Sequence, residues 1–474
     1  MKKTFWIALI LIMIFALTLV SCDKDNGTDS SKPDSGVTDT VTGEGETEAT
    51  TEDNLVDDED DGKINLFSGG LVCFFDGEKW GYANTDGEVV IEPQYVNAYA
   101  FAKNGLALVS TNGTAYGYIN TSGEHVIAES YISATGFNSN GLAIVWNASR
   151  KAGVINARGE TVVEFIYDNI HEFDKNGLAI AVVYDMSAGK TLRGVIDIGG
   201  ETVFPVKYED IYLPARSGNA LVKEDGLWGI MNGDGEWVTK PRYATATEFN
   251  SYNLSIVSDS SGEFGVINHR GDVVVKPSYE SIGVFSEDEG LAFFCDEGKY
   301  GIINTKGEIV VEPTYDSVVS GFCEGRAIIV YRDDYIAINK QGEEIFEFED
   351  CIPHGGYSNG LVVVQEIRRD GKVGKFGYMD KRGKLVIEFD YASADAFYPH
   401  KYAMVCDGKY YGFVDKKGSE VISIDYDGAL GFFSDGYAVV FENGVDNIAK
   451  CIILNKEGDV VLDGAVSVRF LSGN

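Results

Sequence analysis

The stretch whose spacing most resembles a catalytic motif is Gly356-Tyr357-Ser358-Asn359-Gly360, which fits the G-x-S-x-G pattern. That pattern yields a nucleophile only where a strand, a sharp turn and a helix expose the serine hydroxyl. The residues that follow, Leu361-Val362-Val363-Val364, have the composition of a strand, not of a helix. A similar glycine-flanked stretch, Gly136 to Gly141, stands at the equivalent place in an earlier repeat. We therefore interpret Ser358 as part of a structural loop, and we predict no catalytic residue.

Metal-ligating residues are dispersed through the chain. The five histidines are at least 46 residues apart, and no HExxH or Cys/His cluster occurs. Asp57, Glu59, Asp61 and Gly62 resemble the first half of an EF-hand calcium loop, but Ser68 stands where the bidentate Glu belongs. Neither a P-loop nor a G-x-G-x-x-G after a strand is found. The sequence thus predicts no cofactor and no metal, with a weak calcium site near Asp57–Gly62 left open.

The charge balance limits the partners. The formal net charge is −35, which repels nucleic acid and anionic lipid headgroups, so we predict no nucleic-acid partner. One basic spot interrupts this surface, in the longer loop from Glu366 to Lys375. It consists of Arg368, Arg369, Lys372 and Lys375. We interpret it as a contact for an acidic partner, with a solvated hairpin tip as the alternative.

The first twenty-two residues resemble a bacterial lipoprotein signal peptide. Lys2 and Lys3 precede an apolar run from Phe5 to Val20, which closes on Ser21-Cys22. The resemblance implies that Cys22 is lipidated and holds the chain on the extracytoplasmic face of the cell membrane. A transmembrane anchor is the alternative, although the apolar run is short for one.

Residues 23–62 predict a disordered acidic linker. They contain fifteen acids, two lysines and no aromatic residue, a composition that cannot bury enough apolar surface to fold. Six cysteines besides Cys22 occur singly with no CxxC, so we expect buried free thiols, although a bridge between distant repeats stays open.

From residue 63 to the end, one unit of about 36 residues recurs eleven times. Its landmark is an aromatic residue, usually before Gly. The landmarks are Trp80, Tyr116, Ala152, Arg193, Trp228, Phe264, Tyr300, Tyr335, Phe376, Tyr411 and Cys451. All eleven copies carry Asn or Asp four residues later and Gly three residues after that, as in Asn84 and Gly87. Asx-x-x-Gly predicts a tight turn between two strands, because Gly accepts a positive φ.

The rest of the unit predicts a third strand and a shared core. Tyr follows the turn glycine by eight residues in nine copies, and Phe follows Tyr by six in seven copies, as in Tyr95 and Phe101. A further apolar run then completes three short antiparallel strands per unit. Because one such sheet cannot bury both faces, neighbouring units must stack. We predict an all-β tandem array of about eleven three-stranded units over residues 63–474. A curved or superhelical array is favoured and a propeller is the alternative.

The unit resembles the bacterial WG (KWG) repeat, named for the pair seen at Trp80-Gly81 and Trp228-Gly229. Ala152, Arg193 and Cys451 depart from the aromatic landmark, and Ile336 and Ile452 replace its glycine. The eighth copy is a candidate seam and the eleventh a candidate cap. The resemblance implies a β array, often exported, with no family-wide catalytic residues.

These observations favour a non-catalytic, surface-anchored lipoprotein whose array binds a protein or a cell-envelope polymer. An extracellular glycan-binding or hydrolytic protein with an acidic cleft is the alternative. The sequence leaves the ligand and the oligomeric state open.

Overall fold

The computed structural model describes residues 64–470, apart from residues 216, 398–400 and 444–448. The predicted signal peptide with Cys22, the linker 23–62, the Asp57–Gly62 motif and His400 lie outside the described residues. The described residues form one compact unit that contains strands and no helix. The all-β prediction is confirmed.

The strands form eleven four-stranded antiparallel sheets, here called blades 1 to 11. Blade 1 contains β3 (Val89–Tyr95), β2 (Trp80–Asn84), β1 (Leu71–Phe75) and β44 (Ser467–Arg469). Blades 2 to 4 contain β4 (Asn97–Ala98), β5 (Ala107–Ser110), β6 (Tyr116–Ile119) and β7 (His125–Tyr131); β8 (Ser133–Ala134), β9 (Leu142–Trp146), β10 (Ala152–Asn156) and β11 (Thr161–Tyr167); and β12 (Asn169–Ile170), β13 (Leu178–Asp185), β14 (Lys190–Asp197) and β15 (Thr202–Tyr208).

Blades 5 to 7 contain β16 (Asp210–Ile211), β17 (Ala220–Glu224), β18 (Leu227–Met231) and β19 (Trp237–Tyr243); β20 (Thr245–Ala246), β21 (Leu254–Ser258), β22 (Phe264–Asn268) and β23 (Val273–Tyr279); and β24 (Ser281–Ile282), β25 (Leu291–Asp296), β26 (Lys299–Asn304) and β27 (Ile309–Tyr315). Blades 8 and 9 contain β28 (Ser317–Cys323), β29 (Arg326–Tyr331), β30 (Asp334–Ile338) and β31 (Glu344–Glu347); and β32 (Cys351–Ser358), β33 (Leu361–Ile367), β34 (Val373–Asp380) and β35 (Leu385–Tyr391). Blades 10 and 11 contain β36 (Ser393–Ala394), β37 (Ala403–Cys406), β38 (Tyr411–Val414) and β39 (Glu420–Tyr426); and β40 (Gly428–Phe432), β41 (Tyr437–Asn443), β42 (Ala449–Asn455) and β43 (Val460–Ala465).

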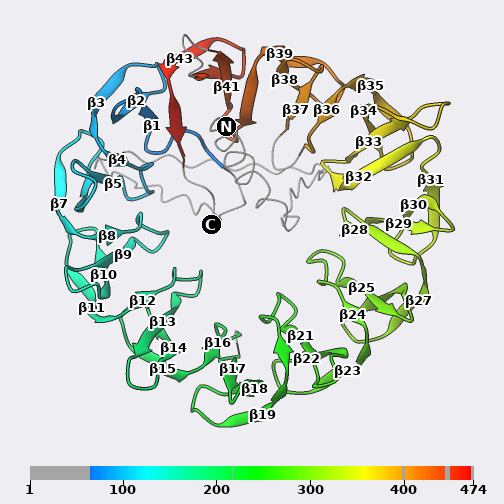
Figure 1. The fold of residues 1–474 in the computed structure, drawn as a ribbon, viewed down its shortest axis with the longest axis horizontal. Helices are drawn as coiled ribbons and strands as arrows, with labels where there is room; N and C mark the ends of the chain where they lie inside the picture. Colours follow the sequence, from blue (N-terminus) through cyan, green and yellow to red (C-terminus); the bar gives the residue numbers. More distant parts are fainter. Residues whose placement is uncertain (1–63, 216, 398–400, 444–448, 471–474) are drawn as a thin grey trace, which may run out of the picture. The chain divides into compact units, whose positions relative to one another are not determined.

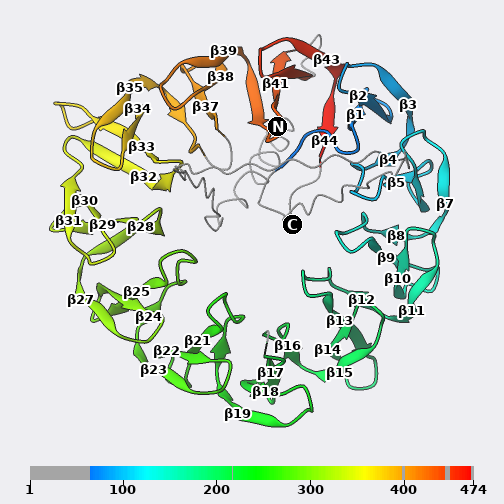
Figure 2. The ribbon, with the colours of Figure 1, turned by 180° about the vertical axis from the view of Figure 1, so that it is seen from behind.

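Each blade has one strand more than the sequence predicted. The additional strand is the innermost one in Figures 1 and 2 and follows the repeated Tyr, as β4 follows Tyr95. In seven blades it is only two residues long. A segment of that length has no measurable alternation, which explains why the three-stranded prediction was wrong in this respect. The landmark lies on the third strand from the inside, and the Asx-x-x-Gly turn joins that strand to the outer strand.

The sheets close into a ring that is an eleven-bladed propeller. Strand β44, near the C-terminus, pairs with β1 through Cys73↔Arg469, Phe74↔Val468 and Phe75↔Ser467. It thereby becomes the innermost strand of blade 1 (Figures 1 and 2). The favoured open array is therefore not observed, and the propeller alternative is. Copy eleven is no cap, because blade 11 has four strands and packs against blade 1 like any other neighbour.

The core consists of eleven apolar clusters, one for each pair of adjacent blades. Between blades 1 and 2, Tyr95 and Phe101 are buried together with Trp80 and Tyr82. The rings of Tyr82 and Phe101 lie 4.9 Å apart. The Tyr82 hydroxyl donates to the Tyr99 carbonyl of the next blade at 2.8 Å. The repeated aromatic residues therefore pack blades together, as the sequence predicted.

The glycine that directly follows the landmark residue, here called the landmark glycine, is required by a bulge in the outer strand. In blade 5, Trp228 pairs with Tyr243 and Ile230 with Thr239, so two steps along β18 face four along β19. Gly229 lies opposite the bulge, where a Cβ atom would be 2.5 Å from the Thr239 carbonyl oxygen. Ile336 replaces this glycine in blade 8, where Ile336↔Glu347 and Ala337↔Phe346 pair without a bulge. The departure from glycine thus follows the local register.

The glycine of the Asx-x-x-Gly turn, here called the turn glycine, contacts the preceding blade. At Gly307, φ is +80°, and a Cβ atom would lie 2.5 Å from the Val274 carbonyl oxygen of the preceding blade. Ten of the eleven turn glycines face the preceding blade within 4 Å in this way, and Gly235 is the exception. The glycine therefore supplies both a left-handed backbone and a close contact between sheets.

We predict that Gly229→Ala destabilises the propeller by about 1–3 kcal/mol, because the methyl group overpacks the bulge. Gly136→Ala is the control, since nothing lies within 4 Å of its Cβ position and its φ is not positive. Chemical denaturation of both variants measures the difference. Equal stability of the two variants would contradict this account of the glycine.

The contact between blades predicts a difference between two glycines at the same repeat position. The φ angles at the two positions are nearly equal, +80° at Gly307 and +81° at Gly235. Alanine in this left-handed conformation therefore costs about 1–2 kcal/mol at either position. Only the first also meets a neighbouring carbonyl. We expect Gly307→Ala to cost a further 1–3 kcal/mol, roughly, in the same denaturation measurement. Indistinguishable midpoints would mean that the contact between blades is unimportant.

Candidate interaction surfaces

The antiparallel order sorts the loops onto two faces of the ring. Hairpins between second and third strands lie on one face, which we call the hairpin face. The Asx-x-x-Gly turns and the loops between inner and second strands lie on the other, the turn face. The β13–β14 and β33–β34 hairpins, the second of which contains the Glu366–Lys375 loop, belong to the hairpin face.

The basic spot lies on the β33–β34 hairpin, and its own acids compensate part of its charge. The Arg368 guanidinium Nε is 3.7 Å from Glu366 Oε2, and Lys372 Nζ is 3.6 Å from Asp370 Oδ2. Lys375 Nζ donates to the Asp390 carbonyl at 2.8 Å. Arg369 is exposed and forms no ion pair with any residue that the structure describes. A contact with an acidic partner stays a prediction, and Arg369 is its best-placed residue.

The G-x-S-x-G stretch forms a β-hairpin. Ser358 ends β32 and is 8% exposed, Asn359 and Gly360 turn with φ of 54° and 87°, and β33 begins at Leu361. The Ser358 hydroxyl has no hydrogen-bond partner among the described residues. Glycine and asparagine serve the turn here, and Gly360 N donates to Glu324 Oε2 of blade 8 at 3.0 Å. The structure gives this motif an architectural role.

Metal-binding and thiol chemistry have little support. Within the described residues, no group of three or more His, Cys, Asp or Glu side chains could hold a metal ion. Free, buried thiols occur at Cys73, Cys295, Cys351, Cys406 and Cys451. Burial raises the pKa of the Cys73 and Cys451 thiols to about 12, so both stay protonated at neutral pH and are poor nucleophiles. No described helix is long and apolar enough to cross a membrane.

Acidic residues that follow the repeated Tyr clamp neighbouring blades on the hairpin face. Asp168 accepts from Lys151 Nζ of blade 3 at 2.6 Å and from Tyr184 N of blade 4 at 2.7 Å. These donors hold the pKa of Asp168 below its usual range, with the Lys151 hydrogen bond contributing most. Asp316 is held in the same way by Lys299 and by Arg332 N. Sequence reasoning missed this clamp, although its signal exists: Lys before the landmark and an acid after Tyr.

Arg193, the landmark of blade 4, holds the equivalent connection between blades 4 and 5. Its guanidinium NH1 donates to the Glu209 carbonyl at 2.7 Å, and its Nε lies 3.5 Å from Asp210 Oδ1. Arginine therefore replaces an aromatic residue where the chain passes from blade 4 to blade 5.

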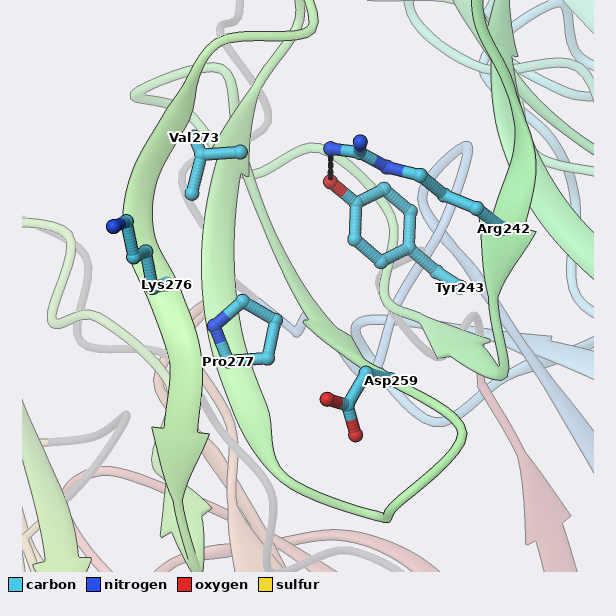
Figure 3. A pocket seen from close by; sticks show the side chains of 6 residues that line it. All are labelled: Arg242, Tyr243, Asp259, Val273, Lys276 and Pro277. Carbon is cyan, nitrogen blue, oxygen red and sulfur yellow. Dashed lines mark hydrogen bonds between the residues drawn. The ribbon is translucent and has the colours of Figure 1, made fainter.

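A hollow of about 300 Å³ lies between the outer parts of blades 5 and 6 (Figure 3). Arg242 and Tyr243 reach it from the end of β19, Asp259 from the β21–β22 turn, and Val273, Lys276 and Pro277 from β23. Arg242 donates to the Tyr243 hydroxyl at 2.5 Å, and its guanidinium carbon is 4.8 Å from the centre of that ring. The hollow combines apolar walls with two cationic side chains. Sequence reasoning did not single out any of these residues.

A family model described as "WG containing repeat" matches nine segments that together span more than half of the chain. The segments are residues 80–114, 116–145, 153–185, 194–228, 228–259, 264–300, 300–334, 376–411 and 411–445. No segment begins at the landmarks Tyr335 and Cys451, the two that are followed by Ile instead of Gly. No curated protein sequence matches the chain.

Solved structures resemble the chain at low identity. A crystal structure of a eukaryotic initiation factor is 8% identical, with a TM-score of 0.42, and the match covers 85% of this chain and 99% of that one. BamB from Moraxella catarrhalis is 11% identical, with a TM-score of 0.27, and the match covers 61% and 97%. PorZ of Porphyromonas gingivalis, a surface component of its type-IX secretion system, is 11% identical, with a TM-score of 0.24 and coverage of 80% and 59%.

The Asp168 clamp predicts a pH-dependent stability difference. Because its pKa is lowered in the folded state, the carboxylate stabilises the fold above the unfolded pKa of about 3.9, and this contribution is lost on acidification. We expect Asp168→Asn to cost about 0.5–1 kcal/mol at pH 7, the size of a partly exposed ion pair, and less at pH 3. Thermal unfolding at both pH values measures it.

Asp234→Asn is the matched control for the clamp. Asp234 lies in an exposed turn, and its carboxylate has no ion pair or hydrogen bond among the described residues. This variant should follow the wild type at both pH values. A difference for Asp168→Asn that does not shrink on acidification would refute the electrostatic explanation.

Proposed function

This chain belongs to the WG-repeat family, and we propose that it is a non-catalytic binding scaffold. In this proposal Cys22 carries a lipid that anchors the chain on the extracytoplasmic face of the cell membrane. The propeller then binds a protein or a cell-envelope polymer.

The observation that carries the proposal is the division between repeated and variable residues. The repeated Gly, Asx, Tyr and Phe residues have structural roles. They form turns and contacts between blades, as at Gly307, or pack in the core, as at Tyr95 and Phe101. Variation gathers in exposed positions, such as the hairpins of the hairpin face and the outer strands. Such surfaces present many weak contacts along one rigid frame, which favours binding over chemistry.

The anchor is tested by metabolic labelling of the full-length chain in bacteria with an alkyne fatty acid. We expect label on the wild type and none on Cys22→Ser, because the thiol is the acylated atom. The Cys22→Ser protein should also be absent from the membrane fraction that detergent extracts. Label that persists on Cys22→Ser would contradict lipidation at this residue.

Binding is tested with the detergent-purified full-length chain against separated envelope polymers and secreted proteins. Saturable binding that persists in Ser358→Ala, with no change in the polymer's length, is the expected result. Absence of saturable binding to every fraction would contradict a scaffold. Polymer cleavage that Ser358→Ala abolishes would replace it with the hydrolytic alternative.

A further inference from the structure

The outer strands of the propeller are divided by charge. Strands β15, β19 and β23, in the adjacent blades 4 to 6, carry four basic residues and no acid. These residues, called the basic belt, are Lys207, Lys240, Arg242 and Lys276. The other eight outer strands, all within the described residues, carry acids and neither Lys nor Arg. Their acids are Glu92, Glu129, Glu164, Glu312, Glu344, Glu347, Glu388, Asp390, Glu420, Asp425 and Asp463.

The fold itself does not require basic residues at these positions. Lys240 and Lys276 stand twelve residues after their landmarks, where other blades carry Glu, as at Glu92 and Glu312. Arg242 stands at fourteen, where other blades carry Asp390 or Asp425. The belt residues are exposed, and none forms an ion pair among the described residues. Lys207 and Arg242 lie over the rings of Tyr208 and Tyr243, but none of the four cations has an acidic partner among the described residues of this protein of net charge −35.

The hollow between blades 5 and 6 lies within this belt (Figure 3). Its volume of about 300 Å³ is at the small end of ligand sites, enough for one compact ring with its substituents. Val273 and Pro277 offer apolar surface, Arg242 and Lys276 supply positive charge, and Asp259 supplies one carboxylate, an acceptor for sugar hydroxyl groups. The contacts of Arg242 with Tyr243 orient its guanidinium, which reduces the entropy lost when an anion binds.

The outer strands disfavour an extended peptide as the occupant. A peptide that adds to a sheet edge needs a regular row of backbone donors and acceptors. Pro241 and Pro277 lack the N–H donor, and both strands are bulged against their neighbours. Recognition at this edge therefore depends on side chains.

The surrounding acids disfavour a densely charged polyanion. The flanking outer strands carry Glu164 in blade 3 and Glu312 in blade 7, so attraction is confined to three blades. Screening at physiological salt limits the range over which each charge acts to about 8 Å. A chain of sugar units with widely spaced anionic groups satisfies both limits, because its neutral parts tolerate the acidic neighbours.

We propose that the basic belt and its hollow bind a linear anionic polysaccharide, one that carries carboxylate or phosphate groups. One anionic sugar unit occupies the hollow, with its ring against Val273 and Pro277 and its charge beside Arg242 and Lys276. Lys207 and Lys240 contact neighbouring units of the chain. This proposal rests on the proposed scaffold function and specifies the chemistry of its partner.

Isothermal titration calorimetry of the detergent-purified full-length chain tests the proposal. The probes are hyaluronan, in which every second sugar carries a carboxylate, poly(ribosyl-ribitol phosphate), in which each ribose-ribitol unit carries one phosphate, and polyglutamate, a non-carbohydrate polyanion. The belt variant is K240E/R242E/K276E, in which each position takes an acid. The matched control is K103E/R382E/K417E, at three exposed basic residues outside the belt and outside the basic hairpin, which changes the net charge equally.

We expect the wild type to bind one or both of the first two polymers, and which one it binds identifies the anionic group. The belt variant should bind at least tenfold more weakly and the control variant within twofold of the wild type. Wild-type affinity should fall with added salt. If the belt variant unfolds at a lower temperature, K240S/R242S replaces it, since Ser423 and Ser130 occupy these positions in other blades.

Three outcomes would overturn the proposal. They are absence of wild-type binding to both polymers, equal loss in the belt and control variants, and binding of polyglutamate as tight as that of the polysaccharides. If envelope fractions still bind the wild type in any of these cases, the scaffold function stands and only the anionic polysaccharide is excluded. If no fraction binds, the scaffold function fails as well.

Discussion

The architecture depends on close approaches at two glycines in the repeat. The landmark glycine lets the outer strand bulge across the third strand of the same blade, where a Cβ atom at Gly229 would lie 2.5 Å from a carbonyl oxygen. The turn glycine lies against the preceding blade in ten of the eleven blades, against a carbonyl oxygen at Gly307 and against side chains in most of the others. Because the contacts of the turn glycines recur around the ring, they set the distance between adjacent sheets. The aromatic clusters between blades then fill the space that this distance defines.

This constraint explains where the chain is free to vary. Ile336 replaces the landmark glycine where Ile336↔Glu347 and Ala337↔Phe346 pair in register, and Ile452 pairs directly with Asp463 beside a register shift between Cys451 and Ile452. Elsewhere the backbone contacts leave glycine no substitute, whereas side chains that point away from the core have no such restriction. The outer strands therefore accept glutamate in blade 7 and lysine in blade 6 at the same position without a change in register. The charge of the outer strands can therefore change without an effect on the fold.

Local regularities were predictable from the sequence, and pairing between distant residues was not. The eleven units, the Asx-x-x-Gly turn and the packing of Tyr95 and Phe101 follow from spacing alone. The inner strand was missed because two residues, such as Asn97 and Ala98, give no periodic signal. Ring closure was missed because β1 and β44 lie at opposite ends of the repeat array, and nothing in a single repeat encodes that pairing. The basic belt has a sequence signal, since Lys240 and Lys276 stand where other copies carry Glu, but it appears only when copies are aligned by landmark.

Closure of the ring also gives the landmark tryptophan of blade 1 a specific role. Strand β44 adds only three residue pairs to β1, which is little to hold the two ends of a long array together. Arg469 strengthens this junction. Its guanidinium carbon lies 4.1 Å from the Trp80 ring and 4.6 Å from the Tyr99 ring, and its NH1 donates to the Ala98 carbonyl at 2.6 Å. One side chain from the C-terminal strand thus joins blade 1 to blade 2, and the Trp80 ring contributes to this junction by receiving the Arg469 cation.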